Sequence, residues 1–272
     1  MAWSALTPLT HDRLDEVAAL AAGAFLHSPS YCYIFEGLSE ARRLEALAWL
    51  FRKNFYLRLS EGSCLCGFKT GPDAAQPENV CAFMLQPPDA PGFSVWLLIM
   101  NGILYLPLKY GVRALVRLLE VMDYEKAAKR AVFNANPGIR FSALERMVVK
   151  PGFQGQGVGT RYLGQALAAE AKKGRAVLLS TQEECNVRFY TRLGFAVLHE
   201  GATFSPIGSV ATGWSMARPA EITSAVKAPA EMPTVAPRDR KTLMSGPLSL
   251  SGVALGILAA VVAVGWIVGD FR

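Results

Sequence analysis

The sequence predicts an α/β fold, in which helices flank a β-sheet, followed by one C-terminal transmembrane helix. Strand-like apolar runs and helical apolar periods follow one another through residues 1–218. A glycine-rich loop at 154–159 joins a strand pattern to a helix pattern. Residues 248–269 contain no charged side chain. We therefore expect a folded domain at 1–218, a flexible linker at 219–247 and a transmembrane helix at 248–269.

The first half of the chain predicts two helices and then a hairpin. Thr10 precedes an apolar helical period, and we expect its hydroxyl to cap that helix. A second helix is predicted from Ser39 to Leu59, with one apolar face formed by Leu44, Leu47, Leu50 and Phe51. Two strands follow at 64–70 and 80–85, joined by a turn at 71–73.

The second half predicts the rest of the sheet. We expect strands at 141–149 and 176–181, with a helix at 158–172 between them. A short helix starts near Asn186 and ends at Gly194, and strands at 195–199 and 212–216 form a closing pair. The apolar stretch 93–108 is interrupted by glycine and proline and is too short to span a bilayer. Two interpretations of it remain, a helix packed over a cleft of the domain and an interfacial segment on a membrane.

The loop at 154–159 has the composition of an anion-binding site. Gly155, Gly157 and Gly159 allow a sharp turn, so that successive backbone N–H groups point to one ligand at the start of the next helix. A diphosphate fits such a loop. Tyr162 stands where a Rossmann loop needs its third glycine, and the loop lacks the Gly-Lys-Ser/Thr of a nucleotide P-loop.

Two motifs in order narrow the ligand further. Gln154-x-x-Gly157-x-Gly159 resembles the signature loop of the GNAT superfamily of acyl-CoA-dependent N-acetyltransferases, and Asn186-x-x-Phe-Tyr190-x-x-x-Gly-Phe195 resembles its second motif. The Ala-Phe-x-x-x-Pro element that ends at Pro29 is similar to that of the puromycin N-acetyltransferase-like branch. The resemblance covers about residues 3–218. It implies a mixed, mostly antiparallel sheet and acetyl-CoA as co-substrate.

The resemblance also implies which residues hold the cofactor. Backbone groups on the strand before the loop pair with the pantetheine arm, the loop and first helical turn hold the pyrophosphate, and an asparagine contacts the arm. The cofactor-binding candidates are Met147, Val148, Val149, Gln154, Gly155, Gln156, Gly157, Val158, Gly159, Thr160 and Asn186. A simple helix cap is the alternative for Asn186.

Two catalytic candidates follow from the needs of amine acetylation. Tyr190, which the family places near the thioester sulfur, is the candidate acid for the leaving thiolate, and a packed aromatic ring is its alternative. The base is harder to assign, because Ser180 stands where relatives often carry glutamate. Glu145 is our candidate base, since apolar neighbours are expected to raise its pKa. A structural ion pair with Arg140 or Arg146 is the alternative for Glu145, and Glu183 and Glu184 are weaker candidates.

The C-terminal segment predicts a tail anchor. As a helix, residues 248–269 extend roughly 33 Å, enough for a bilayer core of about 30 Å. Arg238, Arg240 and Lys241 precede this span, so we expect the catalytic domain to face the cytosol. The first fifteen residues lack the basic and apolar regions of a signal peptide. The membrane itself stays open among the ER, mitochondrial and plastid outer membranes.

Composition excludes some other functions. The net charge of +6 comes from dispersed residues rather than a basic patch, which argues against nucleic acid as a partner. Five cysteines without a regular framework indicate free thiols in a reducing compartment, and three scattered histidines disfavour zinc.

The sequence therefore predicts a membrane-anchored acetyltransferase that moves an acetyl group from acetyl-CoA to a primary amine. Small amines, lipid amines and protein lysines or N-termini remain possible acceptors. Three alternatives stay open: a longer acyl-CoA donor, a protein that binds coenzyme A without turnover, and a tethered scaffold on a membrane.

Overall fold

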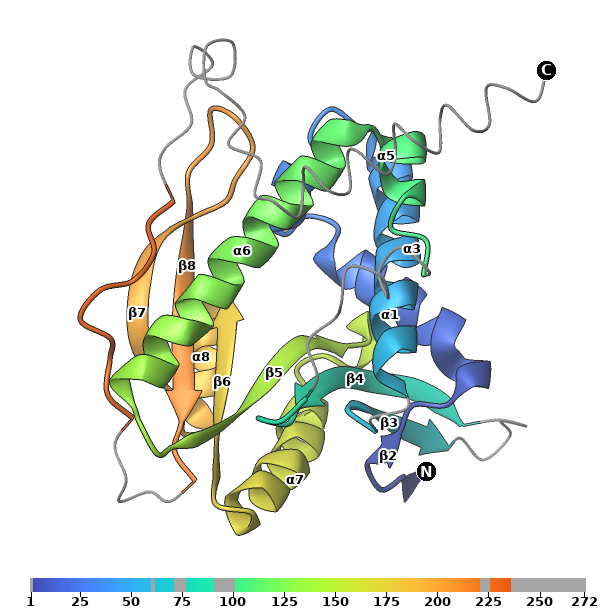
Figure 1. Ribbon diagram of the computed structural model, residues 1–272. Helices are drawn as coiled ribbons and strands as arrows, with labels where there is room; N and C mark the ends of the chain where they lie inside the picture. Colours follow the sequence, from blue (N-terminus) through green and yellow to red (C-terminus); the bar gives the residue numbers. More distant parts are fainter. Residues whose placement is uncertain (1, 60–61, 71–76, 91–100, 221–225, 236–272) are drawn as a thin grey trace, which may run out of the picture.

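The computed structural model describes residues 2–59, 62–70, 77–90, 101–220 and 226–235. Its centre is an eight-stranded mixed sheet in the order β1-β3-β4-β5-β6-β8-β7, with β2 also paired to β3 (Figure 1). Every neighbouring pair is antiparallel except β5 and β6, which run parallel. The predicted mixed, mostly antiparallel α/β sheet is therefore confirmed.

Groups of strands and groups of helices alternate along the chain. The strands are β1 (Ala2–Trp3), β2 (Thr7–Pro8), β3 (Cys64–Thr70), β4 (Glu78–Gln86), β5 (Arg140–Val149), β6 (Arg175–Thr181), β7 (Ala196–Thr203) and β8 (Ala211–Arg218). The α-helices are α1 (Leu14–Phe25), α2 (Pro29–Ile34), α3 (Glu40–Arg58), α5 (Tyr105–Tyr110), α6 (Val112–Ala135), α7 (Val158–Lys172) and α8 (Glu184–Arg192). Short 3-10 turns precede α1 at His11–Arg13 and α7 at Pro151–Phe153.

Helices cover both faces of the sheet. α1, α2, α3, α5 and α6 share one large apolar core that includes Leu47, Phe51 and Leu115. α7 and α8 pack on the opposite face around Tyr162, Leu163 and Tyr190. A third, smaller cluster joins the end of α6 to β5, β6 and β8. Figure 1 shows α6 crossing the β6–β8 half of the sheet, with α7 below β4 and β5.

Two local predictions are corrected. Thr10 does stand before the first helical turn, but its hydroxyl makes no capping hydrogen bond, and a 3-10 turn separates it from α1. Ser39, by contrast, caps α3 by accepting a hydrogen bond from the backbone N–H of Arg42. Leu44 was assigned to the buried face of this helix and is 39% exposed, whereas Leu47 and Phe51 are fully buried. The apolar stripe of α3 is therefore narrower than the sequence pattern suggests.

The segment at 93–108 is described in part. α5 buries Leu106, Pro107 and Tyr110 against the main core and leaves Leu108 75% exposed. This packing fits the interpretation as a covering helix for residues 105–110, and residues 91–100 lie outside the described part of the chain.

The structure describes only part of the predicted linker and none of the predicted transmembrane helix. Within the described residues no helix is both long enough and apolar enough to cross a bilayer, and the predicted span at 248–269 lies outside them. In the predicted linker, the backbone N–H and C=O of Lys227 bond to the Asn136 side chain at 2.7 and 2.8 Å. Val226 and Val235 pack against the domain as well. Residues 226–235 are therefore held to the domain surface.

Candidate active site

The sheet opens between its two parallel strands. β5 and β6 pair only from Arg140↔Arg175 to Ala143↔Leu178, although both strands continue beyond that point. A bulge in β5 adds to the divergence, because Ala82 pairs with Val148 while Met84 pairs with Glu145. Arg146 within this bulge has a φ of 53°, the left-handed region that non-glycine residues rarely adopt. The second half of β5 is thus bonded to β4 and diverges from β6.

The glycine-rich loop lies at the end of the divergent half of β5. Gly155 and Gly157 have φ values of 73° and 74°, and a Cβ on either would meet nothing within 4 Å. Their conformation, rather than a lack of space, is what requires glycine here. Gln154 donates from Nε2 to the carbonyl of Val149 at 3.1 Å, and Gln156 donates to the carbonyl of Gly152 at 2.8 Å. These two side chains hold the loop in its turn.

The loop leads into a helix start whose backbone donors have no helical acceptor. Gly157 is the N-cap of α7, and its carbonyl accepts the first helical bond from the N–H of Arg161 at 2.9 Å. The N–H groups of Val158, Gly159 and Thr160 therefore have no acceptor within the helix. The loop from Gln154 to Gly157 is exposed. An anion placed here would meet several N–H donors and the positive end of the helix dipole.

Gly159 serves a different purpose from the two loop glycines. A Cβ on it would lie 3.1 Å from Phe189 Cζ, 3.3 Å from Val149 Cγ2 and 3.4 Å from Met147 Cε. The absence of a side chain lets the start of α7 pack closely on β5 and α8. The structure thus brings the predicted cofactor-binding residues of β5, the loop and α7 together.

α8 completes this side of the opening. Asn186 donates from Nδ2 to Thr181 Oγ1 at 3.2 Å, which ties the first turn of α8 to the end of β6. Glu183, not Asn186, is the N-cap of this helix. Tyr190 is buried and makes edge contacts with Phe189 and Phe195 at 5.1 and 5.6 Å between ring centres. Burial, followed by the nearby Cys81, raises the pKa of the Tyr190 hydroxyl, so it stays protonated at neutral pH.

Glu145 does not have the environment that a raised pKa needs. Its carboxylate accepts hydrogen bonds from Lys129 Nζ and Arg146 Nη1, both at 2.5 Å, and from Gln86 Nε2 at 3.1 Å. Burial alone raises its pKa, but Lys129 and Arg146 together lower it to about 2. The expectation of a raised pKa is wrong. Glu145 is a structural ion-pair partner, and a carboxylate this acidic is a weak base.

A cavity lies on the opposite face of the sheet, between α6 and strands β6 to β8. Its walls include Tyr124 and Glu125 from α6, Ser180 from β6, and His199 and Trp214 from β7 and β8. The resemblance left the residue at position 180 without its usual glutamate, and Glu125 enters the same cavity from the helix. Sequence reasoning missed Glu125. The signal was its spacing, because Glu125 is four residues after Val121 and three residues before Ala128, and both of these are buried on the same helix face.

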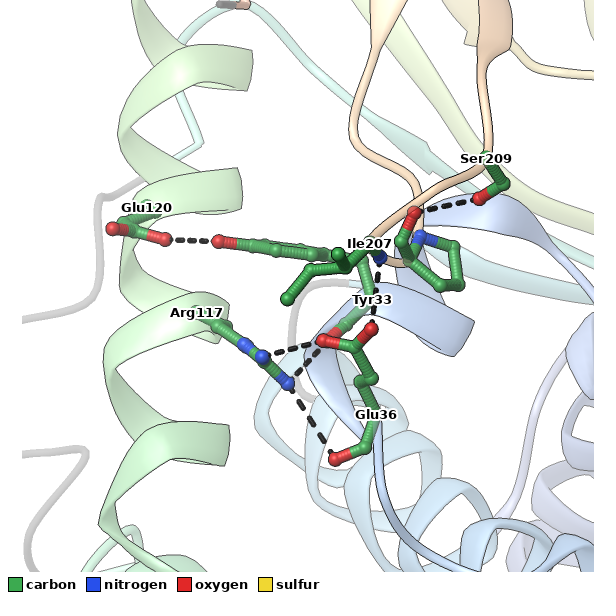
Figure 2. A network of polar contacts seen from close by, with 7 residues as sticks. Tyr33, Glu36, Arg117, Glu120, Ile207 and Ser209 are labelled. Carbon is green, nitrogen blue, oxygen red and sulfur yellow. Dashed lines mark hydrogen bonds and ion pairs between the residues drawn. The ribbon is translucent and has the colours of Figure 1, made fainter. Parts of the chain in front are cut away.

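Two sets of polar contacts join the elements from which the cavity is built. Gln182 accepts hydrogen bonds from Ser28 Oγ and the Ser30 N–H, both at 3.1 Å, and so connects the end of β6 to α2. Figure 2 shows the second connection, where Arg117 on α6 donates to the Glu36 carboxylate at 2.5 Å and to the Tyr33 carbonyl at 3.1 Å. The other Glu36 oxygen accepts the N–H of Ile207 at 2.8 Å. This network attaches the β7–β8 hairpin to α2 and α6 across the cavity.

Metal ligands do not gather in the described part of the chain, where no three His, Cys, Asp or Glu residues lie close enough to hold a metal ion. Cys64, Cys66 and Cys81 are buried free thiols. Burial raises the pKa of the Cys81 thiol to about 12, which keeps it protonated.

Comparisons with known proteins agree with the sequence motifs. The family model described as "Acetyltransferase (GNAT) domain" matches residues 120–197, less than a third of the chain. These residues run from α6 through the glycine-rich loop to α8, so both motifs lie inside the match. No curated protein matches the chain at a significant level.

Solved structures of acetyltransferases are also similar in outline. A histone acetyltransferase HPA2 and related acetyltransferase from Corynebacterium glutamicum is 20% identical, with a TM-score of 0.48 over 86% of this chain and 100% of that one. The putative acetyltransferase yncA from Salmonella typhimurium, solved with acetyl-CoA, is 13% identical, with a TM-score of 0.46 over 84% and 99%. A polyamine N-acetyltransferase from Drosophila melanogaster is 13% identical, with a TM-score of 0.46 over 80% and 100%.

Proposed function

We propose that this chain, an acetyl-CoA-dependent acetyltransferase with a GNAT domain at residues 120–197, acetylates a primary amine while anchored to a membrane by its C-terminal segment. The observation that carries the catalytic part is the opening between β5 and β6 with a glycine-rich loop at its end. The anchor rests on the uncharged residues 248–269 and the basic residues before them. In this arrangement the catalytic domain faces the cytosol.

The donor site follows from the geometry of the loop. The N–H groups around Gly157 and the start of α7 bind the pyrophosphate, with Gln154 and Gln156 bracing the turn. Backbone groups of Met147, Val148 and Val149 lie along the divergent part of β5 and pair with the pantetheine arm. Asn186 lies at the other side of the opening, beside Thr181. The thioester is thereby directed through the sheet toward the cavity.

Tyr190 is proposed as the acid for the leaving thiolate. Its raised pKa keeps its proton in place until the thiolate forms. Attack of the neutral amine nitrogen on the carbonyl carbon forms the C–N bond, and the C–S bond breaks as the tetrahedral adduct collapses. The thiolate takes the Tyr190 proton, which solvent then replaces, and the amine nitrogen loses its own proton to a base.

Turnover by a defined fragment tests the enzymatic part. Residues 1–235 keep every described contact of the domain, so this fragment should convert acetyl-CoA and an amine to free coenzyme A and an acetylated product. We would offer octylamine, phenethylamine, spermidine and a lysine peptide, and read the products by mass spectrometry. Binding of acetyl-CoA without thiol release favours the non-turnover alternative. A melting temperature that acetyl-CoA leaves unchanged favours the scaffold.

Membrane anchoring is tested on the full chain. We expect it to remain in the membrane fraction after alkaline carbonate extraction, while the 1–235 fragment stays in the supernatant. Protease added to intact organelles should then digest the domain if it faces the cytosol. Release of the full chain by carbonate would contradict the anchor without affecting the enzymatic proposal.

A further inference from the structure

Glu125 is the one carboxylate among the described residues that line the cavity between α6 and the sheet. Its neighbours in the wall include the apolar side chains of Val121, Tyr124 and Ala128 from its own helix, and Phe204 and Trp214 from the opposite wall. The wall also carries the polar side chains of Ser180, Gln182 and His199, although most of its accessible surface is apolar. One carboxylate in a wall of this kind fits a ligand with one positive charge and an apolar body.

Glu125 also lies at the opening of the sheet. Ser180, at the divergent end of β6, lines the same cavity. On the β5 side, Glu145 and Arg146 are close enough to influence the charge of Glu125. Glu125 therefore shares a cavity with the divergent end of β6 and lies near the bulged part of β5, on the α6 face of the sheet.

The two nearby glutamates differ in their partners. Glu145 is engaged by both Lys129 and Arg146. Glu125 has no hydrogen-bond or ion-pair partner among the residues that the structure describes, and it remains accessible to solvent in the cavity. Because Lys129 is already paired with Glu145, the carboxylate of Glu125 is available to a ligand.

The surroundings of Glu125 also suit proton transfer. The groups that face it are Tyr31 from α2, Tyr124 and Lys129 from α6, Glu145 and Arg146 from β5, and His199 from β7. Surrounding protein atoms raise the pKa of Glu125, Lys129 lowers it, and Glu145 raises it again, with a net increase above 4.5. A carboxylate with a raised pKa is a better proton acceptor near neutral pH than an ordinary one.

We propose that Glu125 binds the ammonium group of the acceptor and takes its proton, and that the acceptor is a monoamine with an apolar body. This inference rests on the proposed function. The ammonium gives one proton to the Glu125 carboxylate, and the neutral nitrogen attacks the thioester carbon. The C–S bond then breaks, and the thiolate takes the Tyr190 proton. Glu125 releases its first proton to solvent and then accepts the second proton from the nitrogen. α6 thus supplies the carboxylate that the strand lacks at Ser180.

The test compares Glu125→Gln with Asp123→Asn in the 1–235 fragment. Both changes remove one carboxylate from an exposed position of α6, but only Glu125 is part of the cavity wall. The readouts are the dissociation constant for acetyl-CoA and the pH profile of kcat/KM, with phenethylamine and octylamine as monoamines and spermidine as a polyamine. Both variants should bind acetyl-CoA like the parent fragment.

The pH profiles should differ in shape. The parent fragment uses ionised Glu125 and the protonated amine, so its kcat/KM should fall on the acid side, where Glu125 is protonated, and should not rise steeply toward the pKa of the amine. Glu125→Gln must capture the rare neutral amine, so its kcat/KM should be about 10²–10⁴-fold lower near pH 7. It should rise about tenfold per pH unit toward an amine pKa of about 10.4. Asp123→Asn should follow the parent profile.

Each of the other outcomes contradicts one component of the proposal. A Glu125→Gln profile equal to that of the parent excludes Glu125 as the base while leaving amine acetylation intact. Turnover of spermidine without turnover of either monoamine contradicts a monoamine as the acceptor. Binding of acetyl-CoA with no turnover of any of the three amines contradicts it as well. A parent fragment that does not bind acetyl-CoA contradicts the proposed function itself.

Discussion

At the residue scale, the chemistry of this site depends on which charged groups are paired. Glu145 sits between two cations and its side chain is 19% exposed. Removing one member of such a group leaves the others buried without compensation. The ion pair therefore matters to stability more than to proton transfer.

We predict that Glu145→Gln lowers the free energy of unfolding by about 3 kcal/mol at pH 7, because Lys129 and Arg146 would lose their counter-ion. Urea unfolding of the variant and the parent measures this difference in free energy. Because the pKa of Glu145 is lowered from 4.5 to about 2, its stabilisation is present above pH 4.5 and is lost as the pH falls toward 2. The difference between variant and parent should shrink over that range.

A matched control is available on α8, where Glu184 forms an exposed pair with Arg188. Glu184→Gln removes the same charge and should change the unfolding free energy by less than about 0.5 kcal/mol. Equal effects of the two substitutions would contradict the structural role of Glu145.

The second residue-scale prediction concerns Tyr190. If its hydroxyl protonates the thiolate, Tyr190→Phe should lower kcat by about 10²–10⁴-fold and leave acetyl-CoA affinity unchanged. Steady-state kinetics and calorimetry measure the two quantities. Tyr162→Phe is the control, because that hydroxyl donates to the carbonyl of Phe68 at 2.9 Å, away from the opening. A Tyr190→Phe rate near that of the parent would reduce Tyr190 to a packed aromatic ring.

At the element scale, the proposed donor site depends on the junction of β5, the loop and α7. The bulge at Arg146 directs the second half of β5 away from β6, and the loop ends where the first turn of α7 begins. The bend in β5 has a local cause, because a bulge bends its strand. The start of α7 also has one, because a left-handed glycine precedes the first helical turn. Together they bring the free N–H groups of α7 to the edge of the opening.

We predict that Gly157→Val abolishes detectable acetyl-CoA binding by calorimetry. Valine is strained at a φ of 74°, so the turn that places the N–H groups at the start of α7 would change its conformation. The control is Gly164→Ala in the middle of α7, where a Cβ meets nothing within 4 Å. That change should keep the affinity and stabilise the fold by about 0.4–1 kcal/mol. Unchanged affinity in Gly157→Val, with the fold intact by circular dichroism, would contradict the assignment of the loop as the acetyl-CoA-binding site.

At the scale of the whole molecule, the sheet separates the glycine-rich loop from the cavity. The loop and α8 lie on the α7 face, and the cavity lies on the α6 face. The C-terminal part of the described chain contributes to the same body, because Lys227 bonds to the buried side chain of Asn136.

We predict that a fragment ending at residue 218 is less stable than one ending at residue 235, by about 1–3 kcal/mol in urea unfolding. Without Lys227, the buried amide of Asn136 loses two partners. Adding Asn136→Ala to each fragment provides the control, because it should reduce the difference between them. Equal stability of the two unmodified fragments would show that residues 226–235 contribute nothing to the fold.

The sequence alone determined features whose causes are local. The helix at 158–172 was predicted at both ends, because a left-handed glycine opens it and an apolar period runs along it. The strands at 64–70 and 176–181 were predicted within one residue from their apolar runs. The glycine loop was assigned for the same reason, since its conformation depends on residues within one turn.

Only the tertiary structure decided which side chains meet. Glu145 lies in an apolar run, and its low pKa comes from Lys129 on a helix that the strand pattern does not reveal. Glu125 reaches the cavity because α6 crosses the strands between which the sheet opens. Charge environments of this kind depend on contacts between separate elements, and a local pattern carries no information about the distance between them.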